Sequence, residues 1–224
     1  MKDIVKLKES EIVKKGFTGN FISKNKKDFL FFEGFANSLF VVEEEGYGNL
    51  YLEFEKYLLT FFDVCSKSVN KPSFIYINGD VAPDKIIQTL GKSYYDIIEQ
   101  EEIYKLNKQP AFYMPFENDD YDELIERFIQ ERSATLNNRE LFIILDNVEK
   151  LSLPMLDKYV TLGRSRNIYF IILIANKKLF IENNMQESFD VIKNNCMLEF
   201  SCSYDKINEC KVLFKSNSVV KVEL

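Results

Sequence analysis

The chain has 224 residues, of which 46% are hydrophobic and 29% are charged, and its formal net charge is −6. This composition is ordinary for a globular domain, and the acidic balance disfavours nucleic acid as a partner, because phosphate binding requires a basic footprint. The chain contains no histidine, which excludes Ser-His and Cys-His nucleophile pairs, imidazole zinc ligands and histidine acid–base catalysis.

The cysteines and the apolar stretches indicate a cytoplasmic protein without a membrane span. The four cysteines, Cys65, Cys196, Cys202 and Cys210, are widely spaced and form no C-x-x-C pair, so we expect buried reduced thiols and no metal site. The longest apolar stretch, Phe29–Val42, is shorter than the roughly 20 residues that a membrane helix needs. The first fifteen residues are charged and have no apolar core of a signal peptide.

Short β-branched or aromatic runs alternate along the chain with longer helical patterns. Before residue 38, Phe17–Asn20 and Phe29–Glu33, which flank the turn Ser23–Asp28, predict a small N-terminal β-hairpin. Strands are predicted at Leu39–Val42, Ser73–Asn78, Ala111–Pro115, Glu140–Asp146, Ile168–Ala175, Met197–Ser201 and Ser218–Glu223. Helices are predicted at Leu50–Ser66, Pro83–Gln100, Asp119–Ser133, Leu153–Leu162, Met185–Asn194 and Tyr204–Phe214.

Three of the predicted strands contain apolar runs without polar alternation, namely 74–77, 141–145 and 170–174. Strands that are buried on both faces have this pattern, so we expect an α/β fold with a mainly parallel sheet flanked by helices. Leu39–Val42, Glu140–Asp146 and Ile168–Ala175 are expected at its centre. The chain has no repeat, linker or low-complexity tract, which predicts a single domain over residues 1–224, with residues 1–37 as a hairpin extension.

The segment after the first of these strands has the position and length of a phosphate-binding loop of the pattern G-x-x-x-x-G-K-S/T. Glu43 replaces the first glycine, Gly46 and Gly48 lie within the loop, Asn49 replaces the lysine and Leu50 replaces the hydroxyl residue. The lysine would contact the β and γ phosphates and the hydroxyl would bind Mg²⁺. Because both are missing and carboxylates precede the glycines, we expect weak triphosphate binding at best.

The strand at 140–146 ends in Asp146 followed by Asn147. An apolar strand that ends in Asp-Glu is the Walker B arrangement, in which Asp supports Mg²⁺ and Glu polarises water. An amide cannot accept a proton, so Asn147 removes the general base. For Asp146, capping of the following loop is the competing interpretation.

Several motifs in this order resemble the TraG/TraD-type coupling proteins of conjugative type IV secretion. They are Ile144-Leu-Asp-Asn-Val-Glu-Lys-Leu151, Gly163-Arg-Ser-Arg-Asn-Ile168, Ile192-Lys-Asn-Asn-Cys196 and the stretch Phe200–Asn208. Upstream, Ser38–Leu50 and Ser73–Gly91 are similar to the P-loop region of that family. The resemblance covers Ser38–Phe214 and implies a RecA-like P-loop ATPase domain.

The departures from that family concern its chemistry and its accessory parts. Asn167 replaces a glycine, Ala175 stands where the family has glutamine, and the transmembrane anchor and all-α insert of the family have no counterpart here. The resemblance allows Arg164 and Arg166 to face the nucleotide of a neighbouring subunit, whereas cations at a helix C-terminus are the simpler interpretation.

We therefore predict a pseudo-ATPase without a catalytic residue or cofactor, which serves as a protein-binding or regulatory component of a conjugation or type IV secretion system. Its partner would be a coupling ATPase, a relaxosome component or a channel protein. The first alternative is a divergent ATPase that binds ATP and Mg²⁺ and is active only in an oligomer. The second alternative is a DNA-binding accessory protein, which the acidic charge disfavours.

Overall fold

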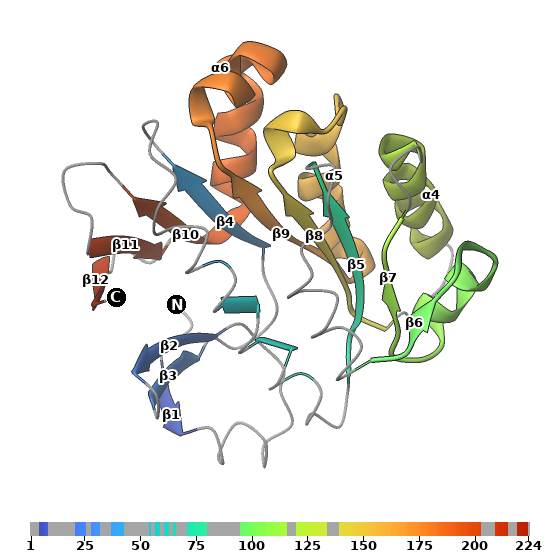
Figure 1. Cartoon of the computed structure of the whole chain (residues 1–224), viewed down its shortest axis with the longest axis horizontal. Helices are drawn as coiled ribbons and strands as arrows, with labels where there is room; N and C mark the ends of the chain where they lie inside the picture. Colours follow the sequence, from blue (N-terminus) through green and yellow to red (C-terminus); the bar gives the residue numbers. More distant parts are fainter. Residues whose placement is uncertain are drawn as a thin grey trace.

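The computed structural model of the chain is shown in Figure 1. It describes residues 5–8, 21–25, 28–31, 37–42, 71–79, 95–115, 120–133, 139–202, 209–214 and 219–223, together with six helical residues between positions 54 and 65.

A twisted sheet occupies the middle of the molecule (Figure 1). Its described strands are β4 (Asn37–Val42), β5 (Ser73–Asn78), β6 (Ile97–Ile98), β7 (Phe112–Tyr113), β8 (Leu141–Asp146), β9 (Ile168–Ile174), β10 (Cys196–Cys202), β11 (Glu209–Phe214) and β12 (Val219–Glu223). They lie in the order β12-β11-β10-β4-β9-β8-β5-β7-β6. All neighbours from β10 to β6 are parallel, whereas β11 and β12 continue the sheet in antiparallel pairing. The predicted α/β class and the central position of β4, β9 and β8 are thus confirmed.

One face of the sheet is covered by three helices whose apolar side chains meet the aliphatic side of the strands. The helices are α4 (Tyr121–Ser133), α5 (Leu156–Gly163) and α6 (Lys177–Asn195). Ile125, Tyr159 and Phe180, one from each helix, belong to the same buried cluster as Ile143 of β8 and Ile172 of β9. The sheet residues in this cluster alternate along each strand, because successive side chains point to opposite faces.

The opposite face is aromatic. Phe74, Phe142 and Tyr169 come from the adjacent strands β5, β8 and β9, and their rings stack in series, with centroid distances of 5.7 Å and 5.4 Å. Phe61 meets Phe142 edge-on at 4.9 Å, and Phe62 meets Phe74 edge-on at 4.8 Å. The helical residues that supply this cover, Phe54, Tyr57, Leu58, Phe61, Phe62 and Cys65, are all buried. They fall within the predicted helix Leu50–Ser66 and have the spacing of one helix face.

The N-terminal strands form a separate antiparallel sheet in the order β1-β3-β2. These strands are β1 (Val5–Lys8), β2 (Phe21–Asn25) and β3 (Asp28–Phe31). The predicted hairpin is therefore present, but its first strand begins later than expected, at Phe21, and the predicted turn Ser23–Asp28 lies largely within the two strands.

Two sequence predictions of helices are wrong in part. The end of the predicted helix Tyr204–Phe214 is strand β11, which pairs with both β10 and β12. The end of the predicted helix Pro83–Gln100 is the short strand β6, followed by the 3-10 helix η1 (Gln100–Asn107). Residues 83–94 lie outside the described part of the chain. Helix α6 begins eight residues earlier than predicted and contains a kink at Met185, where φ is 69°.

Candidate functional site

The parallel strands give the sheet a carboxyl edge, at which β4, β5, β8 and β9 end, and an amino edge, at which they begin. In open α/β sheets, ligands bind beyond the carboxyl ends of the strands. Strand β4 ends at Val42 with all six of its residues buried. The predicted phosphate-loop positions Glu43, Gly46, Gly48, Asn49 and Leu50 lie outside the described residues, so their placement stays a prediction.

Asp146 lies at the carboxyl edge as the last residue of β8, and its side chain is fully buried. The hydroxyl of Tyr76, on the adjacent strand β5, donates a hydrogen bond of 2.5 Å to Oδ2 of Asp146. The backbone N–H of Gly79 donates to the carbonyl of Asp146 at 2.8 Å. Asp146 therefore connects the ends of β5 and β8. Capping of the following loop by its side chain stays a prediction.

Asn147 adopts the left-handed conformation, with φ 52° and ψ 51°, and only 4% of it is exposed. Asparagine tolerates this region better than most residues with a Cβ. The turn lies against β5, since a Cβ added to Gly79 would overlap the carbonyl oxygen of Asn147. The 3-10 helix η2 (Val148–Lys150) follows at once. At the position where a catalytic Glu would follow the strand, the chain thus places a buried amide.

Glu149, which the sequence analysis did not select as a site residue, is a second buried carboxylate at this edge, with 2% exposure. Its Oε2 accepts a hydrogen bond of 3.1 Å from the backbone N–H of Ala175, directly after β9. Its carbonyl accepts a bond of 3.1 Å from the amide of Asn183 in α6. Burial raises the pKa of Glu149, although the hydrogen bond from Ala175 acts in the opposite direction. The sequence feature that could have identified Glu149 is its position three residues after Asp146, because one turn of η2 directs it back toward the sheet.

Arg164 and Arg166 lie far from these carboxylates. They form the 3-10 helix η3 (Arg164–Arg166), which precedes β9, and so they lie at the amino edge. The seven residues of β9 separate them from the carboxyl edge by about 23 Å, at 3.3 Å per residue. Arg164 is exposed and Arg166 is half-buried. Within this chain they are not brought together with Asp146 and Asn147.

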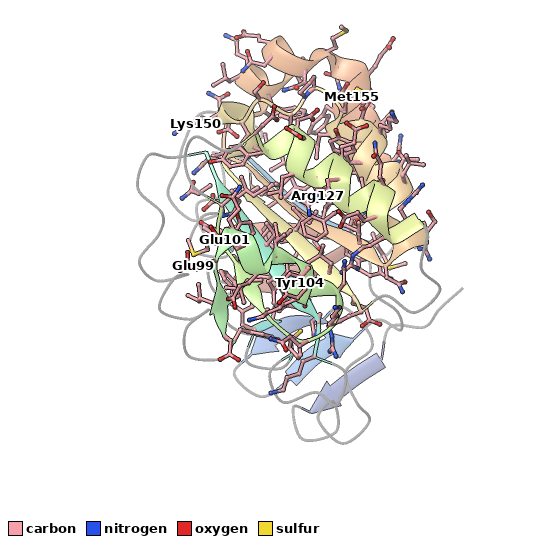
Figure 2. All side chains as sticks on the ribbon, turned by 90° about the vertical axis from the view of Figure 1, so that its right-hand side faces the viewer. Glu99, Glu101, Tyr104, Arg127, Lys150 and Met155 are labelled. Carbon is pink, nitrogen blue, oxygen red and sulfur yellow. The ribbon has the colours of Figure 1, made fainter. Side chains whose placement is uncertain are left out.

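A small pocket lies between η1, β7 and the start of α4, on the side of the molecule shown in Figure 2, where Glu99, Glu101 and Arg127 are labelled. Its volume is about 170 Å³, and Gln100, Tyr113, Asp120, Glu123, Leu124 and Arg127 line it. Drug-sized ligands occupy pockets of roughly 300–1,000 Å³, so this pocket is too small for a nucleotide. In the described part of the chain, no group of three or more Cys, Asp or Glu residues could hold a metal ion.

Other sequence expectations concern the cysteines and the membrane. Cys65 and Cys196 are buried free thiols, as predicted. Of the helices that the structure describes, none is both long and apolar enough to cross a bilayer.

The parallel sheet flanked by helices is similar to the fold of solved ATPase structures. One is the DNA-packaging ATPase B204 from Sulfolobus Turreted Icosahedral Virus, with a TM-score of 0.56 and 10% identity over 84% of this chain and 97% of that chain. Another is B204 from Sulfolobus turreted icosahedral virus 2, a genome-packaging NTPase in complex with ATP-gammaS, with a TM-score of 0.55 and 11% identity over the same shares. A third, described as an ATPase, has a TM-score of 0.55 and 10% identity over 96% of this chain and 92% of that chain.

No protein-family model and no curated protein sequence matches the chain. At about 10% identity the structural likeness shows the fold alone.

Proposed function

We propose that the chain is a non-hydrolysing relative of the P-loop ATPases that functions by binding another protein. The observation that carries this proposal is the buried, left-handed Asn147 directly after Asp146. An amide accepts no proton at neutral pH, so it cannot serve as a general base.

The two carboxylates near Asn147 do not take over its missing role. Oδ2 of Asp146 accepts the hydroxyl of Tyr76, and Oε2 of Glu149 accepts the backbone N–H of Ala175. Both carboxylates are at least 98% buried. A general base needs to reach the proton that it removes, within about 3 Å or through one water molecule. Both groups instead hold strand ends together, which supports a structural role.

The sequence at the end of β4 supports the same proposal. Glu43, Glu44 and Glu45 follow the strand directly, and neither the lysine nor the hydroxyl residue of a phosphate loop is present. Carboxylates repel a triphosphate, by about 1 kcal/mol in water and about 4 kcal/mol at an effective dielectric of 20 for one pair of charges 4 Å apart. A helix N-terminus offsets this by only about half a positive charge.

The setting that we propose is a conjugation or type IV secretion apparatus, because the resemblance to coupling proteins extends in order from Ser38 to Phe214. The partner would be an intact coupling ATPase, a relaxosome component or a channel protein. B204 is a DNA-packaging ATPase, and this likeness makes a DNA-packaging apparatus the alternative setting.

A second candidate function is nucleotide binding by an oligomer that completes the site between subunits. It is favoured by Asp146, which retains the Walker B position, and by the B204 structures with ATP-gammaS and AMP. Under this alternative ATP and Mg²⁺ are the ligands.

Phosphate release and nucleotide binding by the purified protein separate the two functions. We expect no phosphate release from Mg-ATP above background and no binding of a fluorescent ATP analogue at millimolar Mg²⁺. The control is the variant Asp146→Asn, which keeps an acceptor for Tyr76. Phosphate release that this variant abolishes would overturn the non-hydrolysing function. For the protein-binding part, a purified P-loop ATPase encoded beside this chain should bind it with micromolar or better affinity, and absence of binding to each candidate partner counts against that part.

A further inference from the structure

The segments that lead into three neighbouring central strands bring basic residues to the amino edge. Lys71, Arg139 and Arg166 each lie two residues before the first residue of β5, β8 or β9. The strand register pairs Ser73 with Leu141 and Leu141 with Ile168, so the three cations lie at the same level. Neighbouring strands are about 4.8 Å apart, and a guanidinium N–H of Arg139 donates to the carbonyl of Lys71. The three residues therefore form one row across the edge.

Two further arginines belong to this edge. Arg132, at the end of α4, is 2% exposed and donates to the carbonyls of Arg139 at 2.6 Å and Asn167 at 3.3 Å. Burial lowers the pKa of Arg132 to about 10, which leaves it charged at neutral pH. Arg164 is exposed, one turn before Asn167. We refer to the four residues that are at least partly exposed, Lys71, Arg139, Arg164 and Arg166, as the basic edge, and Arg132 is buried beside them.

Among the described residues, exposed carboxylates near this edge are Asp96, directly before β6, and Glu131, beside Arg132. Glu140 is the carboxylate in the connecting segments of this edge, and it lies close enough to Arg132 to oppose the lowering of that pKa. Three salt bridges of the described residues, Lys105–Glu102, Arg127–Glu131 and Lys193–Glu199, do not involve the basic edge. Arg139 and Arg166 each give one donor atom to backbone carbonyls, whereas a guanidinium has five N–H donors.

The carboxyl edge of the sheet carries charges of both signs. Asp120 and Glu123 at the start of α4 are exposed there, and so are Lys150 at the end of η2 and Lys178 near the start of α6. The chain as a whole carries a net charge of −6. The row of cations at the amino edge is thus a local basic cluster in an acidic protein.

We propose that the basic edge is a docking surface for a short acidic segment of a partner protein. Guanidinium groups bind carboxylates through two parallel hydrogen bonds, which favours arginine over lysine at such a surface. A long nucleic acid would extend beyond the row over a chain with a net charge of −6, whereas a short segment stays within about one Debye length, roughly 8 Å at physiological salt. The proposal rests on the proposed function only in that the partner is a protein, and it is independent of nucleotide binding.

The test uses the full chain and a fluorescein-labelled ten-residue peptide of alternating Glu and Ser, titrated by fluorescence anisotropy at 20 mM and 150 mM NaCl. The variant Arg164→Ala/Arg166→Ala should weaken binding at least tenfold, and the wild-type affinity should fall as salt increases. The matched control is Arg127→Ala/Lys178→Ala, which removes two exposed cations elsewhere and should change the affinity less than twofold. Because Arg166 also bonds to Leu162, the single variant Arg164→Glu provides a measurement that does not depend on this contact.

A labelled ten-nucleotide single-stranded DNA is titrated in parallel. The proposal is overturned if the wild type does not bind the peptide at 20 mM NaCl, or if Arg164→Glu binds it as the wild type does. Tighter binding of the DNA than of the peptide, lost in the same variants, would overturn it in favour of a nucleic-acid surface. Failure here leaves the ATPase measurement unaffected, so the two proposals fail separately.

Discussion

The hydroxyl of Tyr76 in the middle of β5 bonds directly to the carboxylate of Asp146 at the end of β8, at 2.5 Å and out of contact with water. The residue that the sequence pattern predicts at the Walker B position is thus hydrogen-bonded to the neighbouring strand β5. This hydrogen bond therefore holds β5 and the carboxyl end of β8 together.

The first prediction concerns this pair. Tyr76→Phe removes the donor and leaves Oδ2 of a buried carboxylate without it, so the free energy of unfolding should fall by about 1–3 kcal/mol. Urea unfolding followed by circular dichroism measures the change. Tyr104→Phe is the control, because Tyr104 is 52% exposed and its hydroxyl is available to water. Equal stabilities of the two variants would contradict the role of the buried hydrogen bond.

The second prediction concerns pH and Glu149, whose pKa burial raises above the ordinary value of 4.5. A carboxyl with a raised pKa in the folded state binds its proton more tightly there than in the unfolded chain. Its contribution to stability is therefore fully present below pH 4.5 and is lost as the pH rises through the folded pKa. Glu149→Gln has no such titration, so its stability relative to the wild type should increase as the pH rises from 4.5.

Urea unfolding of Glu149→Gln and the wild type, at a series of pH values from 4 to 8, measures this difference. A Gln side chain still offers a carbonyl oxygen to the N–H of Ala175, whereas Glu149→Ala leaves that N–H without its acceptor and should be less stable than Glu149→Gln at every pH. If the stability difference between the wild type and Glu149→Gln does not change with pH, the pKa of Glu149 is not raised in the folded protein.

The third prediction concerns the contact of the β5 and β8 turns. The Cβ of Gly79→Ala would overlap the carbonyl oxygen of Asn147 and lie 2.9 Å from Cβ of Lys150. Because the first of these atoms is backbone, the turn has to shift, and we expect a loss of about 1–3 kcal/mol. Asn147→Gly is the companion variant, in which the left-handed residue becomes a glycine that adopts this conformation without steric cost. If Gly79→Ala melts at the same temperature as Asn147→Gly, that result would be inconsistent with the close approach of Gly79 to Asn147.

The fourth prediction tests the assignment of the loop after β4. Thermal melting of the natural chain should be insensitive to millimolar Mg-ATP, because no ligand contribution to stability is present. The variant Glu43→Gly/Glu45→Ser/Asn49→Lys/Leu50→Thr restores the phosphate-loop pattern, and it should gain about 2.7 kcal/mol at a hundredfold excess of nucleotide over Kd. A large shift in the natural chain would argue against a degenerate site, and no shift in the restored variant would argue against the alignment of the loop.

Much of the fold could be predicted from sequence because the central strands are buried on both faces. Runs such as 141–145 contain only apolar residues, and the structure places each of them in the core. Strand β11 could not be assigned this way, since its six residues become a strand through pairing with β10 and β12 rather than through local preference. The two-residue strand β6 likewise depends on pairing with β7, which the local pattern does not specify.

The candidate site was less predictable than the fold. Asp146 and Asn147 could be found because they end a recognisable strand, but the role of Glu149 depends on η2, whose turn directs it to Ala175, 26 residues away in sequence. From the sequence, Arg164 and Arg166 were the residues of the basic edge that could be singled out. Its other members come from segments that only the parallel register of β5, β8 and β9 brings to one level.

The position of β4 between β9 and β10 has a consequence for how the chain reaches its native state. Strand β4 is synthesised well before both of its neighbours in the sheet, and Asn37 at its start bonds to Val160, Phe170 and Asn195, which lie 123, 133 and 158 residues further along the chain. Pairings between such distant segments fold slowly, because a long loop has to close before any contact rewards it. Nascent chains that end before Ile168 leave β4 without a partner. During this interval the unpaired edges of β4 are open to wrong pairing and aggregation.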